Sequence, residues 1–189
     1  MKLSYPVAVL LAKIAEREAT KLQVPMAISI ADDQGNMIYF GCMDNTLPAG
    51  REIAISKAYT AAILRMDTRM VGELSNPGKP LYGIQNTHQG RLILFGGGLP
   101  LFDGTQVVGG IGISGGSVEE DEKVARPVQA TFETMMTCAA MITKIIPRDK
   151  SLKVSSDCIE KIIRRKLDKG PSDEHVVLMI TGALLLALA

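Results

Sequence analysis

The segment from 105 to 116 constrains the fold more than any other part of the sequence. It has the pattern of a strand with recurrent glycine, and it ends in Gly-Gly-Ile-Gly-Ile-Ser-Gly-Gly at residues 109–116. Glycines along a strand leave room for other atoms to come close to the backbone. The pattern therefore indicates either a ligand site or a helix or second chain packed tightly on the sheet.

Residues 110–115 also match the Gly-x-Gly-x-x-Gly pattern of dinucleotide-binding loops. That loop requires a helix that opens inside the motif, with the phosphates at the amino end of the helix. Here the match lies within a strand, and the helix that follows begins with four carboxylates at 119–122. Negative charge at that point would repel a pyrophosphate, so we exclude nucleotide binding there.

Hydrophobic periodicity and turn residues predict an α+β chain with antiparallel strands. The long final helix begins after a capping box at Ser117–Glu120. The order is helix, two strands, helix, three strands, helix. The predicted elements are a helix over 4–22, a hairpin of 26–31 with 37–40, a helix over 51–66, a long loop over 72–90, strands over 91–95, 99–102 and 105–114, and a helix over 124–146.

Composition excludes several classes of partner. Lys plus Arg number 21 against 20 Asp plus Glu, and a net charge of +1 argues against nucleic-acid binding. The charge-free run over 176–189 is shorter than the roughly 20 residues of a membrane-spanning helix, and the start of the sequence lacks a secretory signal pattern. Cys42, Cys138 and Cys158 are too far apart for a disulfide framework or metal cluster. We therefore expect no membrane partner and a cytoplasmic location.

A group of small and polar residues forms the candidate ligand site. Lys57 and Thr60 lie one turn apart on a helix that is otherwise rich in alanine, where a ligand or a partner helix could lie. Three consecutive glycines at 96–98 indicate either a shaped recess or a plain bulge. The predicted ligand-binding residues are Met43, Asp44, Lys57, Thr60, Gly96, Gly97, Gly98, Ser114, Gly115 and Gly116.

Histidine is scarce, which limits metal chemistry. Only His88 and His175 are present, so neither a histidine metal cluster nor a hydrolase triad is indicated, and no catalytic residues are assigned. His88 lies in a polar loop, where it is either a solvated side chain or the ligand of a haem iron.

The composition of the chain changes after Pro147. A charged linker leads to residues 157–169, where isoleucine and leucine share one face of a short amphipathic helix. That face either docks on the chain's own core or binds a partner. We therefore divide the sequence into a domain at 1–146 and a helical extension at 147–189.

Several motifs in order resemble the GlcG/HbpS family, which includes the carboxy-terminal domain of PduO. They are Ala31-Asp32-Asp33-x-Gly35, Met43-Asp44, Ile53-Ala54-x-x-Lys57-Ala58-x-Thr60-Ala61, Gly96-Gly97-Gly98-x-Pro100, and residues 109–116 with Glu120-Asp121. The resemblance covers residues 1–145. It implies a profilin-like, three-layer α/β/α fold with a five-stranded antiparallel sheet, a homo-oligomer and, for some members, bound haem.

The same resemblance shapes the functional hypothesis. Haem-binding PduO-type domains use a histidine of the first helix, which is absent from residues 4–22, so His88 or another side chain would have to replace it. Residues 157–169 also resemble the helices that direct cargo into bacterial microcompartments, which implies a shell or cargo partner and a location inside a microcompartment.

Three functions follow from these observations. The leading hypothesis is an accessory protein that binds a tetrapyrrole, either haem or a corrinoid such as cobalamin, in diol or glycolate utilisation. The second is a structural or cargo-adaptor protein of a metabolic compartment. The third is an enzyme that acts on a small hydroxy acid or aldehyde, with Lys57 as the reactive group.

Overall fold

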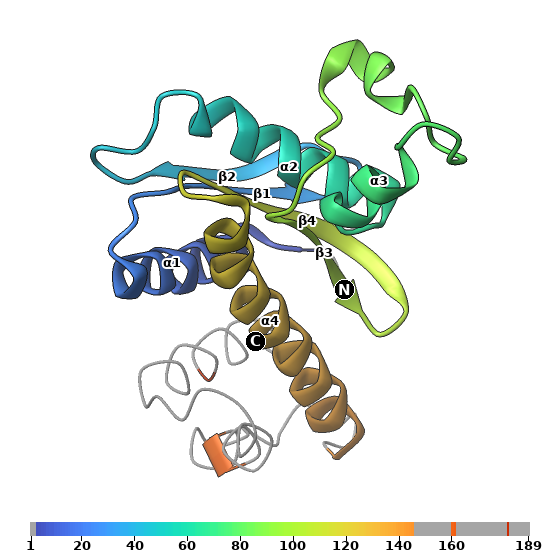
Figure 1. Cartoon of the computed structure of the whole chain (residues 1–189). Helices are drawn as coiled ribbons and strands as arrows, with labels where there is room; N and C mark the ends of the chain where they lie inside the picture. The colour runs from blue at the N-terminus through green and yellow to red at the C-terminus, as the bar shows by residue number, and fades with distance from the viewer. Residues whose placement is uncertain (1–2, 146–159, 162–180, 182–189) are drawn as a thin grey trace. The chain divides into compact units, whose positions relative to one another are not determined.

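The computed structural model describes residues 3–145, 160–161 and 181 (Figure 1). The chain divides into two compact units, Met1–Ala130 and Thr131–Ala189. The division predicted at residue 146 stays a prediction. The elements are α1 (Tyr5–Leu22), β1 (Ala27–Asp32), β2 (Met37–Cys42), α2 (Gly50–Leu64), α3 (Thr68–Leu74), the 3-10 turns η1 (Ile84–Asn86) and η2 (His88–Gly90), β3 (Gly98–Asp103), β4 (Gln106–Ser114) and α4 (Val118–Ile145).

The strands form one antiparallel sheet in the order β2-β1-β4-β3. Both hairpins arise where the sequence predicts them. The Asp32 carboxylate accepts hydrogen bonds from the backbone N–H groups of Gln34 and Asn36, which closes the first turn. Gly104 closes the second turn with φ +63, in the left-handed region that glycine enters without strain.

The glycines of β4 make room for α2, which lies on one face of the sheet (Figure 1). A Cβ atom at Gly112 would overlap the carbonyl oxygen of Ala54, and one at Gly110 would lie 2.5 Å from that of Ala58. Of the two interpretations of these glycines, close packing of a helix therefore holds at Gly110 and Gly112.

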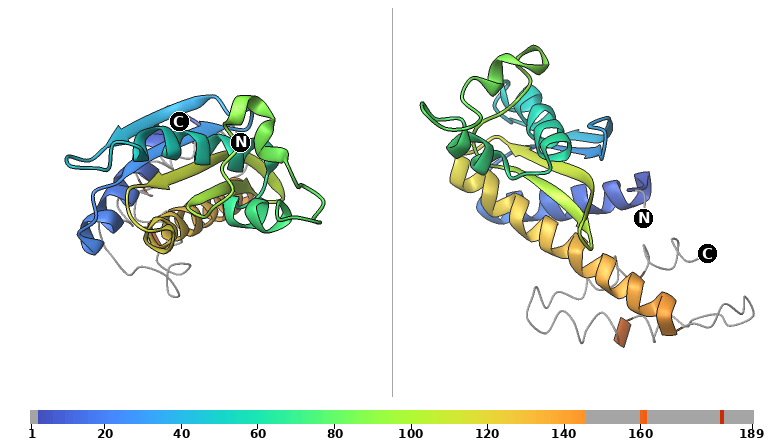
Figure 2. Two further views of the ribbon diagram at one scale, coloured as in Figure 1. Left: turned by 45° about the horizontal axis from the view of Figure 1, so that its top comes forward. Right: turned by 90° about the vertical axis from the view of Figure 1, so that its right-hand side faces the viewer.

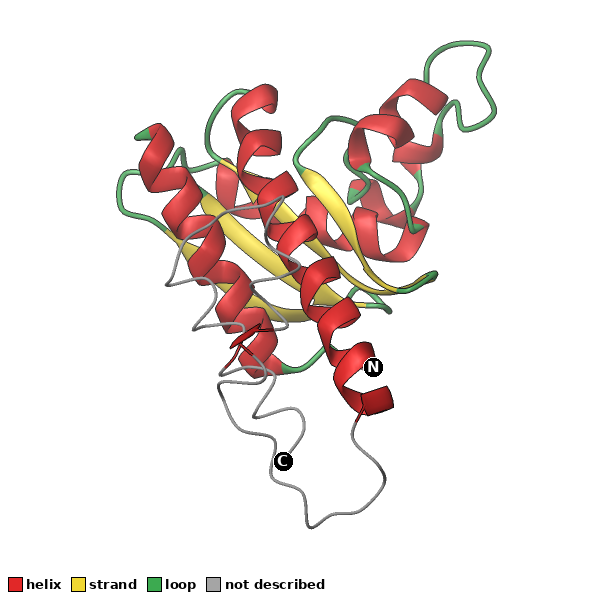
Figure 3. Cartoon of the chain, turned by 90° about the horizontal axis from the view of Figure 1, so that it is seen from below, coloured by secondary structure: helices red, strands yellow, loops and turns green. Residues whose placement is uncertain are grey.

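The opposite face of the sheet is aliphatic and supports α1 and the first part of α4 (Figure 3). Alternation along β1 and β4 directs their isoleucines to this face, away from α2. Helices thus lie on both sides of the sheet, as expected for three layers. The buried isoleucines are Ile28, Ile30, Ile111 and Ile113.

The prediction of a strand over 91–95 is wrong, and the described part of the chain has four strands rather than five. The reason is a tertiary contact with α2. The hydroxyl of Thr60 accepts the N–H of Ile93 at 3.0 Å and lies 3.5 Å from the carbonyl oxygen of Arg91. The N–H of Ile93 is therefore paired with a side chain of α2 instead of with a neighbouring strand.

The predicted loop over 72–90 contains more structure than expected. It includes the end of α3 and both 3-10 turns, and it lies beside α2 in both views of Figure 2. The predicted helix over 157–169 and the apolar run over 176–189 lie outside the described residues, except for Glu160, Lys161 and Thr181. Within the part of the chain that is described, none of the helices has the length and apolar character needed to cross a membrane.

Ser29 gives a test of the packing between α2 and the sheet. It pairs with Gly112 across the sheet, is 1% exposed, and its hydroxyl has no hydrogen-bond partner among the described residues. A buried hydroxyl without a partner destabilises a fold. We expect Ser29→Ala to raise the free energy of unfolding by up to about 1 kcal/mol in urea denaturation.

Ser75→Ala is the matched control. Ser75 is also buried, but its hydroxyl donates to the Val71 carbonyl at 2.6 Å, so its loss should lower stability by about 1 kcal/mol. Equal destabilisation by the two substitutions would contradict our account of Ser29.

Candidate functional site

The residues predicted to bind a ligand fall into two separate groups. Lys57 is directed toward β4 and α4, where it contacts Ile113 and Asp121. Tyr59, two positions later in α2, contacts His88. Residues two apart on a helix are rotated by about 200°, so the Lys57 group and the His88 group lie on different sides of α2.

Lys57 is enclosed by protein atoms. Its side chain is 0% exposed, and its ammonium nitrogen donates to the Asp121 carboxylate at 2.6 Å and to the Ile113 carbonyl at 2.8 Å. The Phe95 ring lies on a third side, with its centroid 5.0 Å from Nζ, which is within the range of a cation–π contact. The buried pair of Lys57 and Asp121 joins α2 to the beginning of α4.

Burial shifts the pKa of each partner in the direction that favours its uncharged form. It lowers the pKa of Lys57 from its ordinary value of 10.5, and the opposite charge of Asp121 acts against this. Burial likewise raises the pKa of Asp121 from 3.8, against the effect of Lys57. Asp121 also accepts the N–H of Gly116 at 3.1 Å, so each partner has more than one polar contact.

The three glycines at 96–98 lie directly against Lys57 and its surroundings. A Cβ at Gly97 would lie 2.7 Å from Lys57 Nζ and 2.8 Å from the Asp121 Cβ. At Gly98 it would lie 2.5 Å from the Thr68 methyl group, and at Gly96 it would overlap the Glu122 carboxylate. Protein atoms therefore fill the space that these glycines leave. Ligand binding by Lys57 and these glycines stays a prediction.

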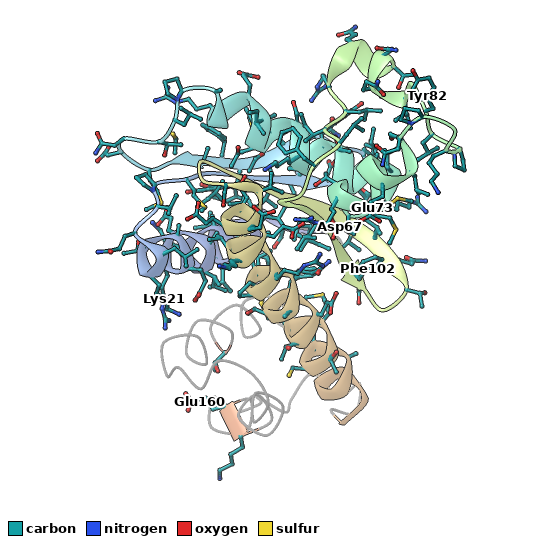
Figure 4. All side chains as sticks on the ribbon, viewed as in Figure 1. Lys21, Asp67, Glu73, Tyr82, Phe102 and Glu160 are labelled. Atoms are coloured by element: carbon teal, nitrogen blue, oxygen red, sulfur yellow. The ribbon has the colours of Figure 1, made fainter. Side chains whose placement is uncertain are left out.

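The four carboxylates at the start of α4 have internal roles, of which the sequence predicted only that of Glu120. Asp121 pairs with Lys57, and Glu122 forms a two-point ion pair with Arg69 at 2.7 and 3.0 Å. Glu120 completes the predicted capping box by accepting the N–H of Ser117 at 2.8 Å, which lowers the pKa of Glu120. Glu119 lies 3.7 Å from Arg69. Nearby, Asp67, labelled in Figure 4, accepts from Arg126.

Met43 and the end of β4 lie near the start of β1. The backbone N–H of Met43 donates to the Met26 carbonyl, and the Met43 sulfur accepts the N–H of Met26 at 3.4 Å. A Cβ at Gly115 would overlap the Pro25 carbonyl oxygen, so Gly115 also packs on this segment. Asp44 is exposed, and Ser114 is buried. Within the described chain, no group of three or more His, Cys, Asp or Glu side chains could hold a metal ion.

His88 belongs to a cluster of three side chains, which we call the Tyr59 cluster: half-buried Tyr59 with exposed His88 and Arg91. The Tyr59 hydroxyl lies 2.9 Å from His88 Nδ1, and the two rings meet edge to face with centroids 5.9 Å apart. The Arg91 guanidinium lies over the Tyr59 ring, 4.0 Å from its centroid. Tyr59 thus positions both a potential metal ligand and a permanent positive charge.

The backbone that carries His88 is strained. His88 has φ 50 and Gln89 has φ 59, and Gly90 follows with φ +76. The left-handed conformation costs roughly 1–2 kcal/mol for a residue with a Cβ. Strain of this kind is frequent at functional sites, where the surrounding structure holds it. Here two such residues, His88 and Gln89, follow one another, and His88 is held by its contact with Tyr59.

These features define a three-layer α+β domain on a single antiparallel sheet, with an exposed histidine held against α2. Residues 3–129 match the model of the family described as "Haem degrading protein HbpS-like". The chain belongs to this GlcG/HbpS-like family, as its motifs indicated.

Individual relatives agree with the family assignment. A 15.0 kDa protein of the dhaT-dhaS intergenic region of Citrobacter freundii is 37% identical over 125 residues, which cover 66% of this chain and 88% of that protein. The corrinoid adenosyltransferase PduO of Salmonella typhimurium is 38% identical over 122 residues. These cover 65% of this chain but 36% of PduO, so the likeness spans about a third of that enzyme.

A solved structure extends the comparison to the fold. The crystal structure of a complex of PduOC with haem has a TM-score of 0.66 and 36% sequence identity, and the match covers 69% of this chain and 94% of that one. The fold of the two proteins is therefore the same over the shared region.

Proposed function

We propose that this protein binds haem through the Tyr59 cluster, with His88 as the ligand of the iron. Two observations support the proposal. A structural relative with 36% identity forms a complex with haem. In addition, this chain presents an exposed histidine whose Nδ1 is already engaged by Tyr59. The second observation identifies His88 as the residue that would bind the iron.

The chemistry of His88 fits an iron ligand. Ligation requires the lone pair of one ring nitrogen, and the other nitrogen then carries the proton. With Nδ1 protonated, His88 donates to the Tyr59 oxygen, and Nε2 is the nitrogen left for the metal. A hydrogen bond of this kind fixes the tautomer and the orientation of metal-bound histidines. Bound haem would supply a redox-active iron.

The test is a haem titration of the full chain, followed by the Soret absorption band. We expect His88→Gly to weaken binding at least tenfold, equivalent to about 1.4 kcal/mol. Glycine suits this position because it adopts φ 50 without strain, so the variant removes the imidazole without burdening the backbone. Added free imidazole should restore the spectrum of the histidine-ligated iron.

Gln89→Gly is the matched control, because it relieves the same left-handed strain one residue later and keeps His88. It should bind haem like the wild-type protein. His175→Ala tests the other histidine, which lies outside the described residues. A Soret band that is unchanged in His88→Gly, or lost in His175→Ala alone, would refute the assignment of His88.

The same titration with cobalamin tests the corrinoid alternative. The role in diol or glycolate utilisation and the homo-oligomer remain parts of the proposal, and size-exclusion chromatography with light scattering tests the oligomer. The predicted shell or cargo partner depends on residues 157–169, of which the structure describes Glu160 and Lys161.

A further inference from the structure

We infer that Arg91 is a specificity-determining residue that binds a carboxylate group of the ligand, so that the Tyr59 cluster selects tetrapyrroles with free propionate groups. This inference rests on the proposed haem function and names the chemistry by which the ligand is recognised. It is drawn from the way in which Tyr59 holds Arg91 beside His88.

The contacts of Arg91 leave its hydrogen-bonding edge available. The guanidinium lies over the Tyr59 ring, 4.0 Å from the centroid. An arginine that stacks on an aromatic face can use the N–H groups along its edge for a carboxylate at the same time. Among the described residues, no carboxylate forms an ion pair with exposed Arg91.

Two other arginines of the same domain differ from Arg91 because each is paired with a carboxylate. Arg69 holds Glu122 through two hydrogen bonds, and Arg126 holds Asp67. Those two guanidinium groups join helices to each other. Arg91 has an aromatic platform in place of an acidic partner, so its charge remains for an acceptor that comes from outside the domain.

Backbone hydrogen bonds hold the segment of Arg91 close to His88 and α2. The Arg91 N–H donates to the His88 carbonyl at 3.2 Å, and the N–H of Ile93, two residues later, donates to the Thr60 hydroxyl at 3.0 Å. The imidazole and the guanidinium are therefore positioned by the same short segment and by the same tyrosine. We expect one ligand that carries both a metal and carboxylates to contact both groups, which is the chemistry of haem and its propionates.

The alternative ligand for Arg91 is a separate small anion, and the choice of probes distinguishes the two. Haem and haem dimethyl ester contain the same iron and the same ring, but the ester lacks both negative charges. We expect the wild-type protein to bind haem about tenfold more tightly than the ester, a difference of about 1.4 kcal/mol. The affinity for haem should fall with added salt, and the affinity for the ester should not.

The decisive variant is Arg91→Gln, measured with both probes by Soret titration. It should lose about tenfold in affinity for haem and keep its affinity for the ester, so that the preference disappears. Arg91→Lys keeps the charge but loses the planar, two-pronged geometry of the guanidinium. Its affinity for haem should lie between those of the wild-type protein and Arg91→Gln. Arg51→Gln is the control, since Arg51 is an exposed residue about 12 Å from Tyr59 along the axis of α2.

The outcomes separate this inference from the proposed function. If neither probe gives a Soret band with the wild-type protein, haem binding itself fails. If both probes bind, but the preference is absent or survives in Arg91→Gln, Arg91 does not recognise propionate. The salt dependence of the wild-type protein decides the same point if a variant does not fold.

Discussion

Asp121→Asn should lower the free energy of unfolding by about 3–5 kcal/mol, because it leaves the buried Lys57 ammonium without its counter-charge. Lys57 is 0% exposed, Asp121 is 2% exposed, and their charged atoms are 2.6 Å apart. Urea denaturation followed by circular dichroism measures the loss. Glu119→Gln is the matched control, since Glu119 lies in the same turn of α4 with a side chain that is 70% exposed.

The destabilisation should also depend on pH in a defined direction. Burial lowers the pKa of Lys57 in the folded chain below 10.5, and Asp121 opposes this by raising it. Without Asp121 the folded-state pKa falls further, whereas the unfolded value stays near 10.5. Between the two values the unfolded chain binds the proton and the folded chain does not, so stability rises with pH.

We therefore expect the difference in stability between Asp121→Asn and the wild-type protein to shrink as the pH rises toward the ordinary lysine pKa of 10.5. Glu122, which also favours the charged form of Lys57, is present in both proteins. Adding Lys57→Met to Asp121→Asn should recover part of the lost stability, because no buried charge then remains. A difference that is flat with pH, or a double variant less stable than the single one, would contradict this account.

Local patterns in the sequence predicted most of the secondary structure. The turns at Asp32–Asn36 and Asp103–Gly104 locate the two hairpins, helical periodicity locates α1 and α2, and the capping box at Ser117–Glu120 locates the beginning of α4. These signals are short-range, because turn geometry and amphipathic spacing depend on residues a few positions apart. The segment over 91–95 has the composition of a strand, but the Thr60 hydroxyl on α2 accepts the N–H of Ile93.

The arrangement of the site was less accessible from the sequence. The lysine on an alanine-rich helix was recognised, but its partner Asp121 is 64 residues away, among four carboxylates that look equivalent in the sequence. Likewise, His88 was recognised, but Tyr59, which orients it, is 29 residues away. Pairing over such separations depends on the tertiary fold. One signal was available, namely a lone lysine on a small-residue face, which needs a carboxylate if it is buried.

Gly97→Val should be strongly destabilising, because Gly97 lies directly against the Lys57–Asp121 pair. Gly97 has φ +105, a conformation that valine resists, and its carbonyl accepts the N–H of Ile113 at 2.9 Å. A Cβ would lie 2.7 Å from Lys57 Nζ and 2.9 Å from the Ile113 carbonyl oxygen. The Lys57 side chain can move only by breaking its buried ion pair, whereas the Ile113 carbonyl is part of the sheet.

Two costs therefore combine, about 1–3 kcal/mol for the backbone and a further share of the roughly 3–5 kcal/mol associated with breaking the pair. We expect a loss of at least about 4 kcal/mol on this basis, measured by urea denaturation, or a chain that does not fold. Gly78→Val separates the two costs, because Gly78 has φ +79 with no atom within 4 Å of the added Cβ. In Gly78→Val only the strained backbone conformation lowers stability. Equal losses in the two variants would show that close contact with Lys57 and Ile113 does not determine the requirement for glycine at position 97.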